Sequence, residues 1–242
     1  MTYRDGDRLR LGLEGPTVRL SVNPRARRLS IRIDARAGEA VVVAPRERLL
    51  TQGLAFARTK AGWIADRLDA RPDEAPLLPG GVVMLKGAPF RLVATGGAGA
   101  ARLGRTADGA AILSGGEGEA FSRRVENLLK RQARDILTAR TDAHLRTLAK
   151  EAGPGPVRVS IVDTRSRWGS CSPHNRSIRY SWRVVMAPEP VIDYLAAHEV
   201  AHLVHADHSP AYWSVVERLV GDHRPYRRWL REHGAALHAV GR

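Results

Sequence analysis

The chain of 242 residues has one cysteine, little lysine and no long hydrophobic run. Cys171 cannot form a disulfide within the chain, which fits a reducing compartment. No run of about 18 or more apolar residues occurs, so no membrane-spanning helix is expected. The N-terminal residues are polar and no apolar segment follows them, so no secretory signal is expected. These absences predict a cytoplasmic protein without a membrane anchor.

Acidic residues are also scarce relative to basic ones. The chain has 25 Asp and Glu against 39 Lys and Arg, a formal net charge of +14. All but four of the basic residues are arginine. Such an excess attracts nucleic acid, nucleotides or anionic lipid. Heavy use of Arg, Ala and Gly also follows from a GC-rich genome, so a functional basic surface and a purely compositional origin both stay open.

Apolar residues alternate over 18–22 and 29–33 and predict two strands, and the apolar run at 41–43, which stops at Pro45, predicts a third. One apolar face over 50–68 predicts a helix, and the runs at 82–85 and 90–93 predict a hairpin. Gly and Ala are frequent over 95–118, which predicts loops with short strands near 103 and 112. We therefore expect a β-rich subdomain with one helix over residues 1–118 and a second domain over 119–242.

In the second part, helical periodicity predicts a long helix over 121–150. Alternation predicts strands at 157–161 and 178–186, with a hairpin tip at 173–176 between them. A shorter helix begins near Pro188 and runs from 191 to about 204. It is apolar nearly all round, which predicts a buried helix. Two further helices follow, so the chain belongs to the α+β class.

The segment His198-Glu199-Val200-Ala201-His202 has the form H-E-x-x-H. Residues four apart on a helix share one face about 6 Å apart, so both imidazoles can converge on one ion. Glu199 lies about 100° round the helix and can border the metal without binding it. Burying these groups without a ligand would cost about 1–3 kcal/mol each. The pattern predicts one zinc ion bound by His198 and His202, with Glu199 as general base for a metal-activated water.

A catalytic zinc site usually has three protein ligands and one open position. His205 lies on almost the same helix stripe as the two motif histidines. Three side chains in a row span about 10 Å and cannot all reach one ion at about 2 Å. The third ligand must approach from another direction, so the chain has to leave the helix and return. Residues 205–207 can make that turn and Ser209-Pro210 can begin the next helix, so we predict His208 as the third ligand.

Acidic and thiol ligands are the alternatives. Glu217 and Glu232 lie on predicted downstream helices, where a solvated helix face is the favoured interpretation. Cys171 as a fourth protein ligand would leave no place for water, so a small packed residue in a strand is favoured. Three arginines flank this cysteine and face either an anionic substrate or water: Arg165, Arg167 and Arg179.

Several short motifs match one family. In chain order they are Arg167-Trp168-Gly169-Ser170-Cys171-Ser172, Ser181-Trp182-Arg183, Ala187-Pro188, Val191-Ile192-Asp193-Tyr194, His198 to Leu203, His208-Ser209 and Tyr212-Trp213. With the weaker Trp63-Ile64 and Leu85-Lys86-Gly87 in the N-terminal part, the chain resembles the YgjP-like metallopeptidase family, which is related to the SprT-like and WLM zincins. Val200 stands where the family usually has leucine, a conservative change.

The resemblance implies an α+β fold with a zincin-like catalytic domain, in which the H-E-x-x-H helix lies under a short sheet, preceded by the small β-rich subdomain. It also implies that the strand near Trp182 borders the substrate cleft. The spacing from the motif to His208 resembles the WLM and metzincin arrangement. Metzincins, however, carry glycine where His205 stands.

We therefore predict a zinc metallopeptidase that acts on a peptide or protein substrate. Some related zincins act on DNA-attached proteins, so a DNA-associated protease is an alternative. A zinc-dependent nucleotide phosphohydrolase is another, with arginines holding the phosphates, although no glycine-rich phosphate loop is visible. A basic nucleic-acid-binding protein with a structural zinc is disfavoured, because such a site needs no glutamate between its histidines. The oligomeric state is left open.

Overall fold

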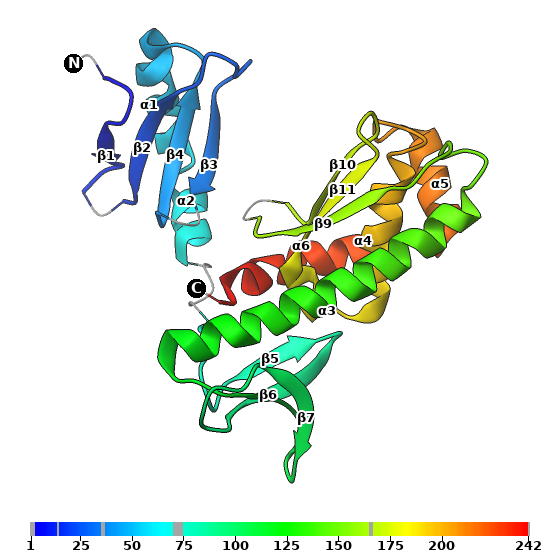
Figure 1. The fold of residues 1–242 in the computed structure, drawn as a ribbon. Coiled ribbons are helices and arrows are strands. Elements are labelled where there is room, and N and C mark those ends of the chain that lie inside the picture. The colour runs from blue at the N-terminus through cyan, green and yellow to red at the C-terminus, as the bar shows by residue number, and fades with distance from the viewer. Residues whose placement is uncertain (1–2, 14, 35–36, 70–74, 165–166, 242) are drawn as a thin grey trace. The chain divides into compact units, whose positions relative to one another are not determined.

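The computed structural model describes residues 3–13, 15–34, 37–69, 75–164 and 167–241 (Figure 1). The chain divides into two compact units, Met1–Pro72 and Asp73–Arg242. The expected boundary between residues 118 and 119 lies inside the second unit. There, the apolar residues of the strands at 82–114 share one core with the helix that follows them, which includes Phe121 and Val125. The Gly-rich sequence between the strands and the helix suggested two separate domains, but both segments pack into one core.

The first unit is a four-stranded sheet with two helices against it. Its strands are β1 (Arg8–Arg10), β2 (Thr17–Val22), β3 (Ser30–Asp34) and β4 (Glu39–Ala44), in the order β1-β2-β4-β3. The predicted strands are confirmed. The single helix expected over 50–68 is two helices, α1 (Leu50–Thr59) and α2 (Ala61–Asp69), after a short 3-10 turn at Glu47–Leu49. The chain leaves helical geometry at Lys60, yet Leu54 before it and Ile64 after it enter the same core.

The second unit begins with another four-stranded sheet and a long helix. The strands β5 (Val82–Leu85), β6 (Ala88–Ala94), β7 (Arg102–Thr106) and β8 (Gly109–Ser114) have the order β5-β6-β8-β7. The predicted hairpin is confirmed, and its turn places Lys86 and Gly87 at positive φ, as a two-residue turn requires. The amide of Lys86 donates to the carbonyl of Val185, so the hairpin tip docks where the chain enters the H-E-x-x-H helix. Helix α3 (Gly118–Thr147) follows.

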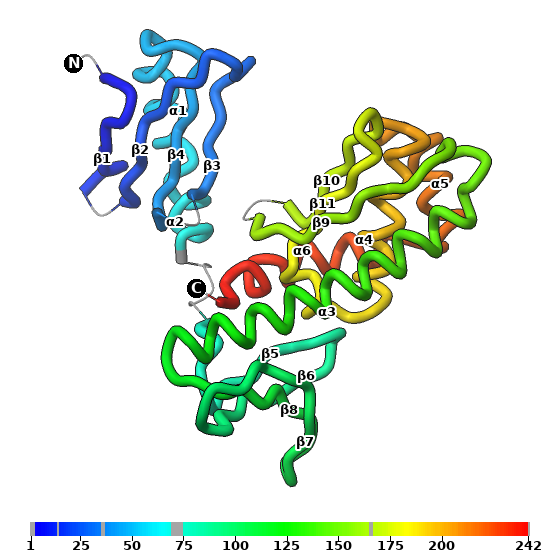
Figure 2. The backbone as a smooth tube through the Cα atoms, viewed as in Figure 1, coloured from blue at the N-terminus to red at the C-terminus, as the bar shows by residue number. Residues whose placement is uncertain are grey.

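The site-bearing half of this unit is a three-stranded sheet and three helices. The strands β9 (Arg158–Val162), β10 (Gly169–Ser172) and β11 (Ser177–Ser181) have the order β10-β11-β9. A 3-10 segment, η2 (Trp182–Met186), leads into α4 (Glu189–Ala201), α5 (Pro210–Val220) and α6 (Arg224–Ala239). Figure 2 traces this path, with α3 running between the two sheets of the unit. No helix among the described residues has the length and apolar character needed to cross a membrane.

Two strand predictions in this half are wrong in detail. The strand expected over 178–186 ends at Ser181, because Trp182 begins the 3-10 segment although its apolar alternation continues. The turn at 173–176 joins β10 to β11, and β9 pairs with β11 in parallel. Strand β10 consists of small residues, so it carries no apolar alternation that would reveal it. The α+β class and the position of the H-E-x-x-H helix against a short sheet are confirmed.

An ion pair joins α3 to α4 close to the site. His144 Nε2 on α3 lies 3.1 Å from Asp193 Oδ1 on α4, and Arg140 adds a second, longer contact of 3.7 Å. The hydrogen bond from His144, together with these charges, lowers the pKa of Asp193 although partial burial opposes the shift. The folded state therefore favours the carboxylate, and the contact stabilises the fold above the unfolded pKa of about 3.9.

We expect Asp193→Asn to lower the free energy of unfolding at pH 7 by about 0.5–1 kcal/mol, since partial exposure screens the pair. The difference from wild type should shrink as the pH falls through the lowered pKa of Asp193, where the wild-type carboxyl also becomes neutral. Urea denaturation at pH 7 and pH 3 measures both values. Glu189→Gln, which removes a more exposed partner of Arg140, should cost less. An equally large loss of stability in Asp193→Asn at both pH values would contradict a stabilising role for the Asp193 carboxylate.

Candidate metal centre

Helix α4 carries the H-E-x-x-H segment at its C-terminal end. The helix is buried on nearly every side, including Ile192, Ala196 and Val200, as the sequence predicts. His198 lies in its last turn, and His202 is the C-terminal cap with helical backbone angles, φ −67° and ψ −16°. The helical spacing between the two histidines is therefore kept although the regular helix ends at Ala201. Both imidazoles contact the ring of Tyr212 on the neighbouring α5, so they lie on one face of the helix.

The chain turns back directly after His202. The amides of Val204 and His205 both donate to the carbonyl of Ala201, which tightens the helix end. The next helix, α5, begins at Pro210 and is capped by Ser209, whose hydroxyl accepts from the amide of Tyr212. His208 therefore lies on a short connection held at both ends. The predicted return of the chain at 205–207 is confirmed.

The turn brings three imidazoles together. His208 Nε2 lies 3.4 Å from His198 Nε2, and one ring nitrogen each from His198, His202 and His208 all lie within 4.8 Å of one another. Tetrahedral zinc with bonds of about 2.0–2.1 Å requires ligand nitrogens about 3.3 Å apart, so small rotations would complete the site. His205 is absent from this group among the described residues. Its carbonyl instead accepts from His202 Nδ1 at 3.2 Å, which leaves the lone pair on Nε2.

The protonation of these histidines suits a cation. Burial, and after it the charges of His202 and His208, lower the pKa of His198 to about 3. Burial also lowers the pKa of His202. Both rings are therefore neutral near pH 7 and offer nitrogen lone pairs. Neutral imidazole is a ligand for zinc, copper, iron and nickel, so the donor set fits a transition metal without selecting one.

Glu199 faces the same space from the next position on the helix. Its side chain is buried, and burial raises its pKa to about 8 while the nearby Arg167 opposes the shift. A raised pKa makes the carboxylate a stronger base, and a divalent cation beside it would favour the ionised form. The carboxyl packs against the backbone of β10 at Gly169. A Cβ at that position would lie 2.7 Å from Cδ and 2.8 Å from Cγ of Glu199.

We expect Gly169→Ala to displace the Glu199 carboxyl and to lower hydrolysis by at least about tenfold, because a base must lie within hydrogen-bond reach of its proton. The metal content should stay at the wild-type level, since the three imidazoles lie on α4 and the turn after it. Turnover and metal content of the purified variant measure both effects. The control is Gly62→Ala, since a Cβ there meets nothing within 4 Å. Full activity in Gly169→Ala would refute this role for the glycine.

A pocket of about 340 Å³ opens beside His198 and Glu199. It is lined by Gly169 at the start of β10, by residues of α4, and by Arg227, Leu230 and Arg231 on α6. The strand near Trp182, which was expected to border the substrate cleft, does not appear in the described lining of this pocket, and that expectation stays a prediction. Trp182 is fully buried in η2, and the edge strand β10 supplies the border.

The other sequence candidates lie apart from the histidines. Cys171 lies in the middle of β10, and burial raises the pKa of its thiol to about 12, so it stays protonated. Glu217 is exposed and pairs with His223 at 3.7 Å, and Glu232 is exposed on α6. None of these three belongs to the group of three histidines that could hold a metal ion, within the described part of the chain.

The arginines that flank Cys171 do not lie together. Arg167 lines the pocket, and Arg179 is exposed on β11 outside the pocket lining. Arg165 lies outside the described residues.

Aromatic residues that sequence reasoning left without a role hold the site together. Tyr212 donates its hydroxyl hydrogen to the carbonyl of His198 at 2.9 Å, and its ring lies 4.6 Å from that of His202. Trp213 stacks on His223 with ring centres 4.5 Å apart and also lies near His208. The position of this tyrosine, three residues after the capping Ser209, is the sequence signal that could have predicted its role. A side chain in the first turn of α5 can point back at α4.

A buried arginine holds the loop before the pocket. Arg183 pairs with Asp163, donates to the carbonyl of Val240 at 2.9 Å and lies over the ring of Trp182 at 4.3 Å. It thereby ties the end of β9 to the end of α6. The amide of Ser181 donates to the carbonyl of Trp168, which fixes the other side of the same loop. The positions of Arg167 and Trp168 at the pocket follow from these contacts.

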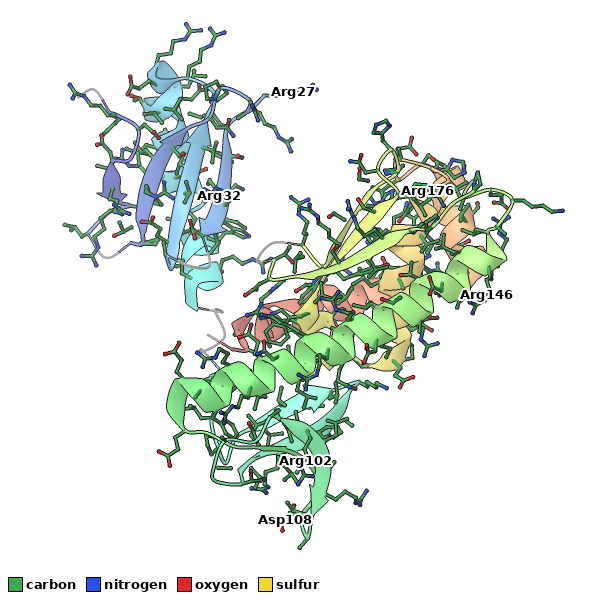
Figure 3. All side chains as sticks on the ribbon, viewed as in Figure 1. Arg27, Arg32, Arg102, Asp108, Arg146 and Arg176 are labelled. Atoms are coloured by element: carbon green, nitrogen blue, oxygen red, sulfur yellow. The ribbon has the colours of Figure 1, made fainter. Side chains whose placement is uncertain are left out.

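The excess of positive charge is spread over the molecule. Figure 3 labels arginines on and before β3 in the first unit, and on β7, on α3 and at the turn between β10 and β11 in the second. Arg8 and Arg19 pair with Glu39, which neutralises part of the charge on the first sheet. The predicted attraction for nucleic acid or nucleotides stays a prediction.

A family model described as YgjP-like, metallopeptidase domain, matches residues 27–233. The chain belongs to the YgjP-like metallopeptidase family. The resemblance seen in the short motifs is thus confirmed, and the match reaches from the first unit to α6. Among solved structures, the chain is similar to the metallopeptidase zymogen abylysin of Pyrococcus abyssi, at 23% identity over 45% of this chain and 92% of that one, with a TM-score of 0.30. No curated protein matches the sequence.

Proposed function

We propose that this YgjP-like family member is a zinc-dependent peptidase with Glu199 as its general base. The observation that carries the proposal is the convergence of His198, His202 and His208, with His198 and the buried Glu199 both in the lining of one pocket. Three imidazoles leave a fourth position open on a tetrahedral ion, as catalytic zinc requires. A purely structural site would have no use for Glu199, whose burial costs free energy.

The residues of the site then have separate roles in the proposed hydrolysis. A zinc ion held by the three imidazoles would polarise the scissile carbonyl and acidify the attacking water. Glu199 accepts the proton of that water and delivers a proton to the amide nitrogen that leaves. Strand β10 lies at the edge of its sheet, so its free backbone groups can pair with an extended substrate chain. Gly169 at the start of this strand keeps the backbone close to Glu199.

Metal analysis and chelation test the proposal. Protein purified without chelator should contain about one zinc per chain and should cleave members of an internally quenched peptide library. Removal of the metal by 1,10-phenanthroline and dialysis should abolish cleavage, and zinc should restore it. A metal content near zero without uptake of added zinc would contradict the zinc site. Hydrolysis of nucleoside triphosphates but of no peptide would favour the phosphohydrolase alternative instead.

A further inference from the structure

The pocket beside the metal centre combines an apolar floor with a basic rim. Tyr194 and Leu195 of α4 and Leu230 of α6 form apolar parts of its lining. Three arginines complete it, one from the loop before β10 and two from α6, namely Arg167, Arg227 and Arg231. Arg167 lies 60 residues or more before Arg227 and Arg231 in the sequence. The three arginines therefore come together only through tertiary packing, in which α6 lies against α4.

These arginines are exposed, and none forms a salt bridge within the described ranges, although Arg167 lies near enough to Glu199 to lower the pKa of its carboxyl. Arg227 is held with its guanidinium over the ring of Trp213, 5.2 Å from the centroid. Glu199 is the only acidic residue in the described lining of the pocket. Three arginines without a salt bridge and one largely buried carboxyl leave an excess of positive charge around an apolar floor, which creates a positive potential in the pocket. A buried or paired arginine would not do this, as the neutralised Arg183 illustrates.

We propose that this pocket selects substrates that present a carboxylate next to the scissile bond, an acidic side chain of the peptide. The inference rests on the proposed peptidase function and names its substrate class. The planar guanidinium forks bind a carboxylate through paired hydrogen bonds, and Leu195 and Leu230 can pack on the methylene groups of a glutamate. A free C-terminal carboxylate has the same chemistry, and the arms of the experiment distinguish the two sources.

The hydrolysis arm uses internally quenched peptides with blocked ends that differ only in Glu or Gln at one scanned position. A third peptide keeps Gln and has a free C-terminal carboxylate. For the zinc-loaded protein, we expect kcat/KM for the best Glu peptide to exceed that of its Gln twin about tenfold or more. The advantage should fall in 0.5 M salt and in Arg227→Gln and Arg231→Gln. Arg228→Gln, an exposed arginine of α6 outside the pocket, is the control.

A binding arm separates failure of this inference from failure of the proposed function. Fluorescence anisotropy of the same peptides on zinc-loaded Glu199→Gln needs no turnover. Tighter binding of the Glu peptide, lost in the two arginine variants, supports the inference even if no peptide is cleaved. Equal binding of the Glu and Gln peptides overturns it even if both are cleaved. A preference for the free C-terminus alone, or binding of pyrophosphate with no binding of either blocked peptide, overturns the assignment to an acidic side chain.

Discussion

Glu199→Gln should lose hydrolysis by about 10²–10⁴-fold while keeping its metal and its fold, because the amide cannot accept the proton of the attacking water. The substitution is nearly isosteric, so the close packing against Gly169 is retained. Removal of a carboxyl whose pKa is raised by burial should not destabilise the protein, since the charged form is the one that burial disfavours.

Three measurements on one preparation check this result: peptide turnover, zinc content by elemental analysis and the melting temperature. Glu232→Gln is the matched control, since this glutamate is exposed on α6 and outside the histidine group. It should behave as wild type in all three. Turnover in Glu199→Gln close to that of wild type would show that another group takes the proton.

The second large effect is expected at His208. His208→Ala should weaken zinc binding by at least about 100-fold, since it removes a ligand and not merely an outer-shell partner, whose loss costs about 10–100-fold. The structural reason is the 3.4 Å separation between its Nε2 and that of His198. His205→Ala should lose much less. The group of His205 that supports the site is its backbone carbonyl, which alanine retains.

Competition with a chromogenic chelator measures zinc affinity for wild type and both variants side by side. Circular dichroism on each protein checks that the overall helix content is that of wild type. Equal or greater loss in His205→Ala, with His208→Ala near wild type, would show that the ring of His205 is the third ligand.

The inferred pocket and the metal centre depend on different packing contacts of the same fold. The histidines need a rigid α4 and a short return, and the ion pair of Asp193 with α3 supports that rigidity. The arginines need only the packing of α6 beside α4. Metal binding and substrate selection should therefore be separable by mutation, with Arg227→Gln and Arg231→Gln keeping full zinc content.

The local periodicity of the sequence predicted many of the strands and helices of this protein. Alternation placed β2, β3 and β9, and helical spacing placed α3, because one buried face imposes its period directly on the sequence. Continuous apolar character placed β4 and α4, which are buried on both faces or nearly all round. The spacing of four between His198 and His202 predicted that the two histidines share one helix face, with Glu199 about 100° round the helix beside them. His208 followed from a distance argument, since a third imidazole on the same stripe cannot reach the ion. The structure brings it beside the other two.

Other features depend on partners far away in the chain, and only the tertiary structure decided them. Strand β10 is formed by small residues paired to β11, and Gly169 is required by a carboxyl 30 positions later. Arg227 and Arg231 belong to the site because α6 packs on α4. The residues before α3 join its core although a Gly-rich stretch precedes it. A sequence period reports that a face is buried but not what covers it, so contacts between distant elements become visible only once the chain has packed.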